Sequence, residues 1–259
     1  MTAKLTKILT RMGWVQPVLG ALALIGLWAF AHAAELVDPV LLPSPAQSWA
    51  AFVEGMAEGS LGHDFWRTIV RTMLSFAIAT VMAVPLGVAL GSSDKLYRSV
   101  EFLIDFFRST PASAMFPLFL VFFGIGEEAK IAVAAFGAAL IILFNTAYGV
   151  MNARQLRQLA ARVMGASKMR ILWDVTIWES LPQTFIGLRS GVSMALVIVI
   201  VAEMFIGSSD GLGKRIIDAQ MIFNMPEMYA SIFAAGALGY VMNMLFTLIE
   251  ARFVHWGGK

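Results

Sequence analysis

Apolar stretches long enough to cross a lipid bilayer, which takes roughly 20 residues as a helix, recur along the chain and constrain its fold more than any other feature. Six such stretches lie at about Val15–Ala34, Thr68–Leu90, Pro111–Gly126, Ile131–Met151, Phe185–Ile206 and Met228–Ile249. They are apolar on every face, whereas a strand of a membrane barrel would alternate apolar and polar residues. A helix also satisfies its own backbone hydrogen bonds in lipid. The sequence therefore predicts an all-α membrane protein with six transmembrane helices, the third of them short.

The composition agrees with a membrane protein and excludes several other classes. Hydrophobic residues make up 59% of the chain and charged residues only 14%, against about 25% charged in a typical soluble domain. The net charge is +2, and the Lys and Arg residues lie between the apolar stretches rather than on one face, which argues against a nucleic-acid-binding protein. The absence of cysteine excludes disulfides, thiolate metal sites and a Cys nucleophile.

The distribution of Lys and Arg predicts the orientation. With the N-terminus inside, the inner segments carry thirteen of these residues and the outer segments four, and inner segments are normally the more basic. The outer segment 35–64 has five acidic residues and no Lys or Arg. We therefore expect both termini to be cytoplasmic. We divide the chain into an N-terminal helix with an outer segment (1–65) and a core of five transmembrane helices (66–259).

The inner segment 152–183 has a pattern that a passive loop would not need. Leu156, Leu159, Ala160 and Val163 recur at the i, i+3, i+4, i+7 spacing of an apolar helix face. Arg154, Arg157 and Arg162 lie off that face, and Gly165 interrupts the helix. The pattern alone fits either an amphipathic helix lying on lipid or a docking helix for a cytosolic partner.

A family resemblance favours the docking helix. The run Leu159–Ser167, followed by Pro182 and then Gly187-Leu188-Arg189, resembles the EAA loop of bacterial ABC importer permeases. The resemblance implies a coupling helix that binds the ATPase subunit. Its residues would be Leu156, Leu159, Ala160, Ala161, Val163, Gly165, Ala166 and Ser167. Leu159 stands where the family usually has Glu, so a polar contact from that position is not expected.

Further motifs extend the resemblance over nearly the whole chain. They are Leu42-Pro43-Ser44-Pro45, Pro85-Leu86-Gly87, Phe144-Asn145-Thr146, Val201-Ala202-Glu203-Met204 and Gly211-Leu212-Gly213. Together they resemble the branch of permeases that imports nitrate, taurine and sulfonates. The resemblance implies a type I importer fold in the bacterial inner membrane, with two permease copies, a cytosolic ATPase dimer and an extracytoplasmic solute-binding protein. ATP and Mg would be bound by the ATPase, and no cofactor is expected in this chain.

Four polar residues are candidates for the transport pathway: Arg108, Asn145, Thr146 and Glu203. An acid such as Glu203 within a span would be costly in lipid, so it should face protein or water and either line the pathway or brace the fold. Asn145 and Thr146 could bind solute, although contact with a neighbouring helix is the better interpretation. Arg108 and Arg71 could attract an anion or anchor their helices at the membrane surface.

Small residues four positions apart predict two close helix contacts. Gly87 and Gly91 form one pair and Gly187 and Gly191 the other. With no side chain in the way, such pairs let two helix backbones approach closely.

The sequence gives no support to a catalytic role. The segment Gly211-Leu212-Gly213-Lys214-Arg215 resembles a phosphate-binding loop, but Ser208 replaces its leading Gly and Arg215 replaces its Ser or Thr. An intramembrane enzyme would need more acids at membrane depth than Glu203. The alternative of an ion channel or secondary transporter would call for a ring of charge or internal repeats, and the sequence displays neither.

Overall fold

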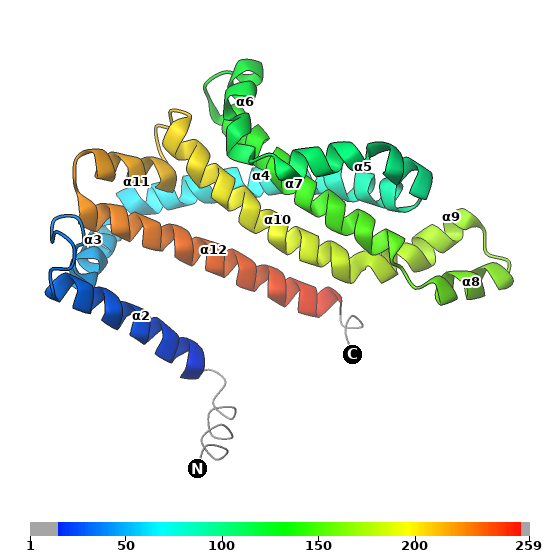
Figure 1. The fold of residues 1–259 in the computed structure, drawn as a ribbon, viewed down its shortest axis with the longest axis horizontal. Coiled ribbons are helices and arrows are strands. Elements are labelled where there is room, and N and C mark those ends of the chain that lie inside the picture. Colours follow the sequence, from blue (N-terminus) through cyan, green and yellow to red (C-terminus); the bar gives the residue numbers. More distant parts are fainter. Residues whose placement is uncertain (1–14, 255–259) are drawn as a thin grey trace, which may run out of the picture.

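The computed structural model describes residues 15–254, and all regular structure within that range is helical (Figure 1). The helices are α2 (Val15–Ala33), α3 (Pro45–Ala57), α4 (Ser60–Gly91), α5 (Asp94–Ser109), η1 (Ala112–Met115), α6 (Phe116–Phe123), α7 (Glu127–Met151), α8 (Gln155–Val163), α9 (Lys168–Ile171), η2 (Leu172–Thr176), α10 (Ile177–Phe205), α11 (Leu212–Met221) and α12 (Met225–Phe253). The terminal residues 1–14 and 255–259, to which the prediction of cytoplasmic termini applies, lie outside the described residues.

Five helical segments of the described chain are long and apolar enough to cross a membrane. They are α2, α4, α7, the continuous segment Lys168–Phe205 that includes α10, and α12. These segments coincide with the first, second, fourth, fifth and sixth predicted spans. The predicted division after residue 65 falls inside α4.

The third predicted span needs correction. Within residues 111–126 the helical stretch Ala112–Phe123 is too short to count as a span by itself; it follows α5 at a bend of 95°, and a sixth crossing exists only if this bent pair counts as one span. The bend lies where Thr110 precedes Pro111. Thr110 has the extended backbone that a following proline favours (φ −83°, ψ 124°). Gly124, at φ 75°, then ends α6.

Helix α7 packs between α4 and α10, and glycines make both contacts close. A Cβ added to Gly87 of α4 would lie 2.7 Å from the Cβ of Thr146 on α7. One turn away on α7, a Cβ on Gly191 of α10 would lie 2.6 Å from Cγ1 of Ile142. Both distances are shorter than real side chains tolerate, so the close contacts predicted from the spacing of glycines are confirmed.

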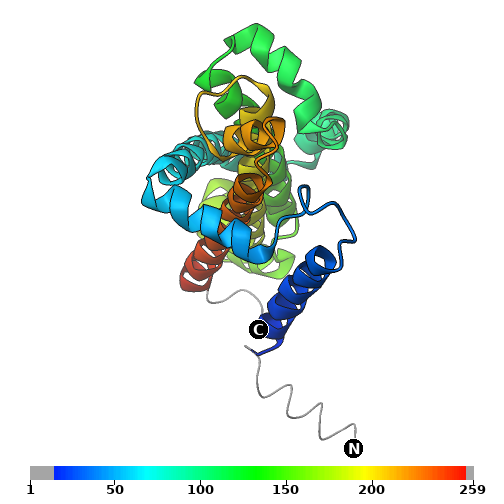
Figure 2. The ribbon, with the colours of Figure 1, turned by 90° about the vertical axis from the view of Figure 1, so that its left-hand side faces the viewer.

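Helix α2 stands apart from this packed centre and contacts α12 and the segment before α3 near its own C-terminal end (Figure 2). The indole nitrogen of Trp28 donates a hydrogen bond to the carbonyl oxygen of Pro43 (2.9 Å), and its ring stacks on Tyr229 of α12 at 5.5 Å between centroids. The remaining surface of α2 is apolar and exposed, as expected for a helix that faces lipid or a second chain.

Candidate functional site

Helix α8 turns its apolar face away from the rest of the chain. Leu156 is 82% exposed and Val163 83%, while Leu159 and Ala160 are also exposed. Ala161 lies on the opposite face and is buried. The helix predicted from the periodicity is therefore present, and its apolar stripe is free to contact another molecule.

Ion pairs fix the other side of α8 to the start of α10. Arg157 donates a hydrogen bond to Glu179, and Arg154 pairs with the same carboxylate at 3.7 Å. Glu179 is largely buried whereas both arginines are exposed. These contacts hold α8 against α10 without using its apolar face.

Gly165 ends the helix in a defined way. Its N–H donates a hydrogen bond to the carbonyl oxygen of Arg162 (2.9 Å), and the N–H of Ala166 donates one to the carbonyl oxygen of Ala161 (3.0 Å). These two hydrogen bonds form a Schellman motif. The motif requires a left-handed residue, and Gly165 has φ +83°. Ser167 then caps α9 by accepting a hydrogen bond from the backbone N–H of Arg170. The predicted interruption at Gly165 is confirmed.

The opposite end of the bundle holds an ion cluster of six residues. We use the name ion cluster for Arg67, Arg71, Glu127, Lys130, Glu203 and Asp210. At its centre, Arg71 of α4 is 1% exposed and Glu203 of α10 has no exposed surface. Arg71 bonds Glu203 through Nη1 (2.7 Å) and Glu127 of α7 through Nε (2.7 Å). One side chain thus joins the three helices of the packed centre.

Neutral groups satisfy the rest of the Glu203 carboxylate. The hydroxyl of Thr68 and the backbone N–H of Gly213 each donate a hydrogen bond to it, both at 2.9 Å. A Cβ on Gly213 would lie 2.1 Å from the carbonyl oxygen of Ile200, so only glycine allows α11 to come this close to α10. In this structure the Gly211–Gly213 motif positions a backbone donor for Glu203.

The outer members of the ion cluster balance its charge. Lys130 is 2% exposed and bonds both Glu127 and the hydroxyl of Ser208 (2.9 Å each). Asp210 lies in the loop before α11 and pairs with Arg71 and Arg67. Burial by itself would raise the pKa of Asp210, but the hydrogen bond and charge of Arg71, helped by Arg67, hold that pKa below its usual range.

Sequence reasoning did not find the ion cluster. It interpreted Arg71 as a residue attracting an anion or anchoring its helix at the membrane surface, and assigned no role to Lys130. The signal available was the presence of acids and bases near the same predicted ends of several spans. That signal does not say which residues pair, because the partners come from distant segments.

The four pathway candidates lie in different places. Glu203 belongs to the ion cluster. Asn145 accepts a hydrogen bond from Gln183 of α10 (2.8 Å), and Thr146 is fully buried against α4. Arg108 of α5 is partly exposed and covers the ring of Phe144 at 3.8 Å. The hydrogen bonds of the described residues join none of the four to another.

Comparison with known proteins identifies the family. Residues 82–256 match the model of the binding-protein-dependent transport system inner membrane component. This chain belongs to that family. The taurine transport system permease protein TauC of Escherichia coli is 26% identical over 96% of this chain and 95% of its own length. The nitrate import permease protein NrtB of Leptolyngbya laminosa is 27% identical over 89% of this chain and 84% of its own.

A solved structure agrees with the assignment. A chain of the MetNI methionine ABC transporter, in an inward-facing conformation, superposes with a TM-score of 0.66 at 25% identity, covering 74% of this chain and 95% of that one. The chain is therefore a multi-pass permease subunit of an ABC importer with the type I fold.

Proposed function

We propose that two copies of this permease form the pathway for a small anion of the sulfonate or nitrate kind across the bacterial inner membrane. An extracytoplasmic binding protein delivers the anion, and α8 couples the pathway to a cytosolic ATPase. Residues of the ion cluster, Glu203 included, brace the permease. The pathway itself is drawn from more exposed groups such as Arg108.

The observation that carries the proposal is the exposed apolar face of α8. An apolar side chain left in water forfeits about 25 cal/mol for each Å² that burial would remove. The arginines on one side of α8 pair with Glu179, and Leu156 and Val163 on the other side are exposed. Such a helix is suited to bind in a groove on another protein. The thirteen-to-four distribution of Lys and Arg supports a cytosolic location for this loop, on the side from which a cytosolic ATPase would dock.

The nature of the solute is supported by the relatives. The two named permeases serve taurine and nitrate, and taurine is a sulfonate; both solutes are small and carry an anionic oxygen group. Uptake of labelled taurine and of nitrate by cells that express the whole importer distinguishes these two solutes. If neither accumulates above the level of cells lacking the permease, the solute is of another class.

A substitution on the exposed face of α8 tests the coupling role. Val163→Glu places a carboxylate where an apolar contact is expected, and it should fold normally because Val163 touches little of its own chain. We expect the ATPase retained on purification to fall roughly tenfold or more, because an unpaired charge in an apolar contact costs a few kcal/mol. Uptake should be lost with it.

The matched control is Gln155→Glu, which adds the same charge to the same helix at an exposed position off the stripe. It should retain the ATPase. Membrane insertion and thermal unfolding of both variants should equal those of the wild type. If Val163→Glu retains a stoichiometric ATPase and still transports, α8 is not the coupling element, and a helix lying on lipid becomes the better interpretation.

A further inference from the structure

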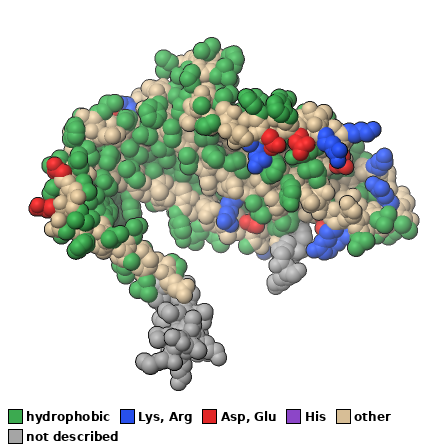
Figure 3. Space-filling model, viewed as in Figure 1, with side chains coloured by type: hydrophobic (Ala, Val, Ile, Leu, Met, Phe, Trp, Pro, Cys, Tyr) green, Lys and Arg blue, Asp and Glu red, His purple; other side chains and the backbone are tan. Residues whose placement is uncertain are grey.

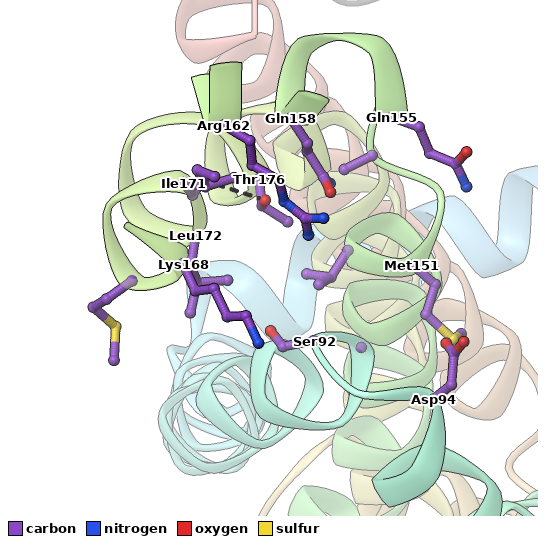
Figure 4. A pocket seen from close by; sticks show the side chains of 14 residues that line it. Ser92, Asp94, Met151, Gln155, Gln158, Arg162, Lys168, Ile171, Leu172 and Thr176 are labelled. Carbon is purple, nitrogen blue, oxygen red and sulfur yellow. Dashed lines mark hydrogen bonds between the residues drawn. The ribbon is translucent and has the colours of Figure 1, made fainter. Parts of the chain in front are cut away.

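A cavity of about 340 Å³ lies between the α8–α9 loop and the ends of two membrane spans (Figure 4). Its floor is formed by Gly91 and Ser92, where α4 ends, and by Met151, where α7 ends. Arg162 of α8 and Lys168 of α9 line its other side. In Figure 4 the Arg162 side chain reaches into the middle of the cavity and that of Lys168 extends toward Ser92.

The two cations of the cavity differ from the other cations of the same loop. Arg154 and Arg157 pair with Glu179, and Arg170 pairs with Asp174 at 3.2 Å. Arg162 and Lys168 have no ion pair or side-chain hydrogen bond within residues 15–254. The unpaired positive charges of this loop are therefore the two that face the cavity.

The surroundings of these two cations favour an anion. Among the described residues, Asp94 is the one carboxylate that lines the cavity, and it lies on the far side beside Met151 in Figure 4. The lining therefore carries two positive charges and one negative charge. The amide of Gln158 also lines the cavity and can donate a hydrogen bond to an oxyanion, whereas the hydroxyl of Ser92 already donates to the carbonyl oxygen of Val88 (2.6 Å).

The depth of the cavity indicates which anion would reach it. Because its floor is made by the ends of two membrane spans, we place it at the level of the lipid headgroups. Trp173 and Trp178, which are exposed on the next turns of the chain, are residues typical of that interface. Long Arg and Lys side chains reach headgroup phosphates from such positions, and basic pockets at the inner ends of spans bind anionic lipids.

We propose that this cavity binds the phosphate of an anionic phospholipid of the inner leaflet, through Arg162 and Lys168. The inner location rests on the orientation given under the proposed function. Since Arg162 lies on α8 and Gly91 and Met151 end α4 and α7, the bound lipid joins the docking helix to the packed centre. Anionic lipid then raises the efficiency with which ATP hydrolysis drives transport.

Native mass spectrometry of the full-length permease with added phosphatidylglycerol tests the site. We expect one lipid held per chain in the wild type and about 30-fold weaker retention in the double variant Arg162→Ala/Lys168→Ala, at roughly 1 kcal/mol for each cation near an anionic surface. The matched control is Arg170→Ala, which removes an exposed cation of the same loop that is already paired. It should retain the lipid.

Two further measurements separate other occupants of the cavity. Inorganic phosphate at millimolar concentration should not displace the lipid; if it stabilises the permease in neutral lipid as well as phosphatidylglycerol does, the ligand is a soluble anion and the lipid proposal is wrong. If the double variant holds phosphatidylglycerol like the wild type but loses the ATPase in neutral detergent, the two cations bind the ATPase instead. If the double variant loses the lipid but retains the ATPase, the result supports this lipid site, whichever result Val163→Glu gives.

Discussion

The ion cluster and helix α8 lie at opposite ends of the same packed helices, and they are built in opposite ways. The ion cluster hides charge: Arg71, Lys130 and Glu203 have almost no exposed surface. Helix α8 exposes apolar surface, with Leu156 and Val163 turned outward. Figure 3 shows Lys and Arg gathered at the α8–α9 end of the molecule, whereas the buried charges of the ion cluster are not on that surface.

This contrast separates two tasks. A buried charge is tolerated only when its partners are held in place, so the ion cluster fixes α4, α7 and α10 relative to one another. An exposed apolar face does not stabilise the fold of its own chain, and it contributes favourable free energy only when another surface covers it. The ion cluster therefore holds the helices of the permease together, and α8 at the other end is suited to bind another molecule.

The sharpest way to break the comparison is to remove the central cation. Arg71→Ala leaves Glu203 buried without its charged partner, and breaking such a pair costs about 3–5 kcal/mol. We expect little folded permease and a large fall in the thermal unfolding midpoint in detergent, unlike Val163→Glu. Adding Glu203→Gln should restore part of the stability. An Arg71→Ala variant as stable as the wild type would mean that the ion cluster does not brace the fold.

The close helix contacts of the packed centre give the next largest effect. Gly87→Ala would bring a Cβ to 2.7 Å from the Cβ of Thr146 and 2.9 Å from the carbonyl oxygen of Leu143. Overpacking of this kind costs about 1–3 kcal/mol. The matched control is Gly236→Ala on α12, where nothing lies within 4 Å of the added carbon, and it should be neutral or slightly stabilising. Equal melting points for the two variants would contradict the packing argument.

Gly165 should show a smaller and local effect. Gly165→Ala meets no atom within 4 Å, so its cost is the strain of a left-handed alanine, about 1 kcal/mol. Amide hydrogen exchange in α8 should then quicken about fivefold while the global unfolding midpoint stays nearly unchanged. A fall in the global midpoint would show that α8 and the packed centre unfold together, against the division drawn between them.

The pH dependence of Asp210 should give the smallest effect. Because its pKa is lowered in the folded chain, its ion pairs contribute their full stability above the unfolded carboxyl pKa of about 4 and lose it as the pH falls below that value. Between pH 8 and 5 the unfolding midpoint should therefore not change through this group. Below pH 4 the wild type should lose more stability than Asp210→Asn, and parallel curves for the two proteins would exclude this contribution.

The bend between α5 and α6 could be predicted from the sequence only in part. Pro111 is visible in the sequence, and its effect on Thr110 is a local rule. An apolar count over residues 111–126 nevertheless predicts a span, because it scores composition and not direction. The structure turns the chain by 95° at this point, so the apolar residues of α6 continue on a different axis from α5.

The sequence by itself determined the features that depend on neighbouring residues: the long apolar helices, the stripe on α8, its end at Gly165 and the glycine pairs that allow close packing. Each follows from spacing within a few turns of helix. Only the tertiary structure decided the role of Arg71 and Glu203, which are 132 residues apart in sequence, and which cations of the α8–α9 loop were left without a partner. A charged residue looks the same in sequence whether it meets lipid, water or an opposite charge. Its partner is set by how distant helices pack.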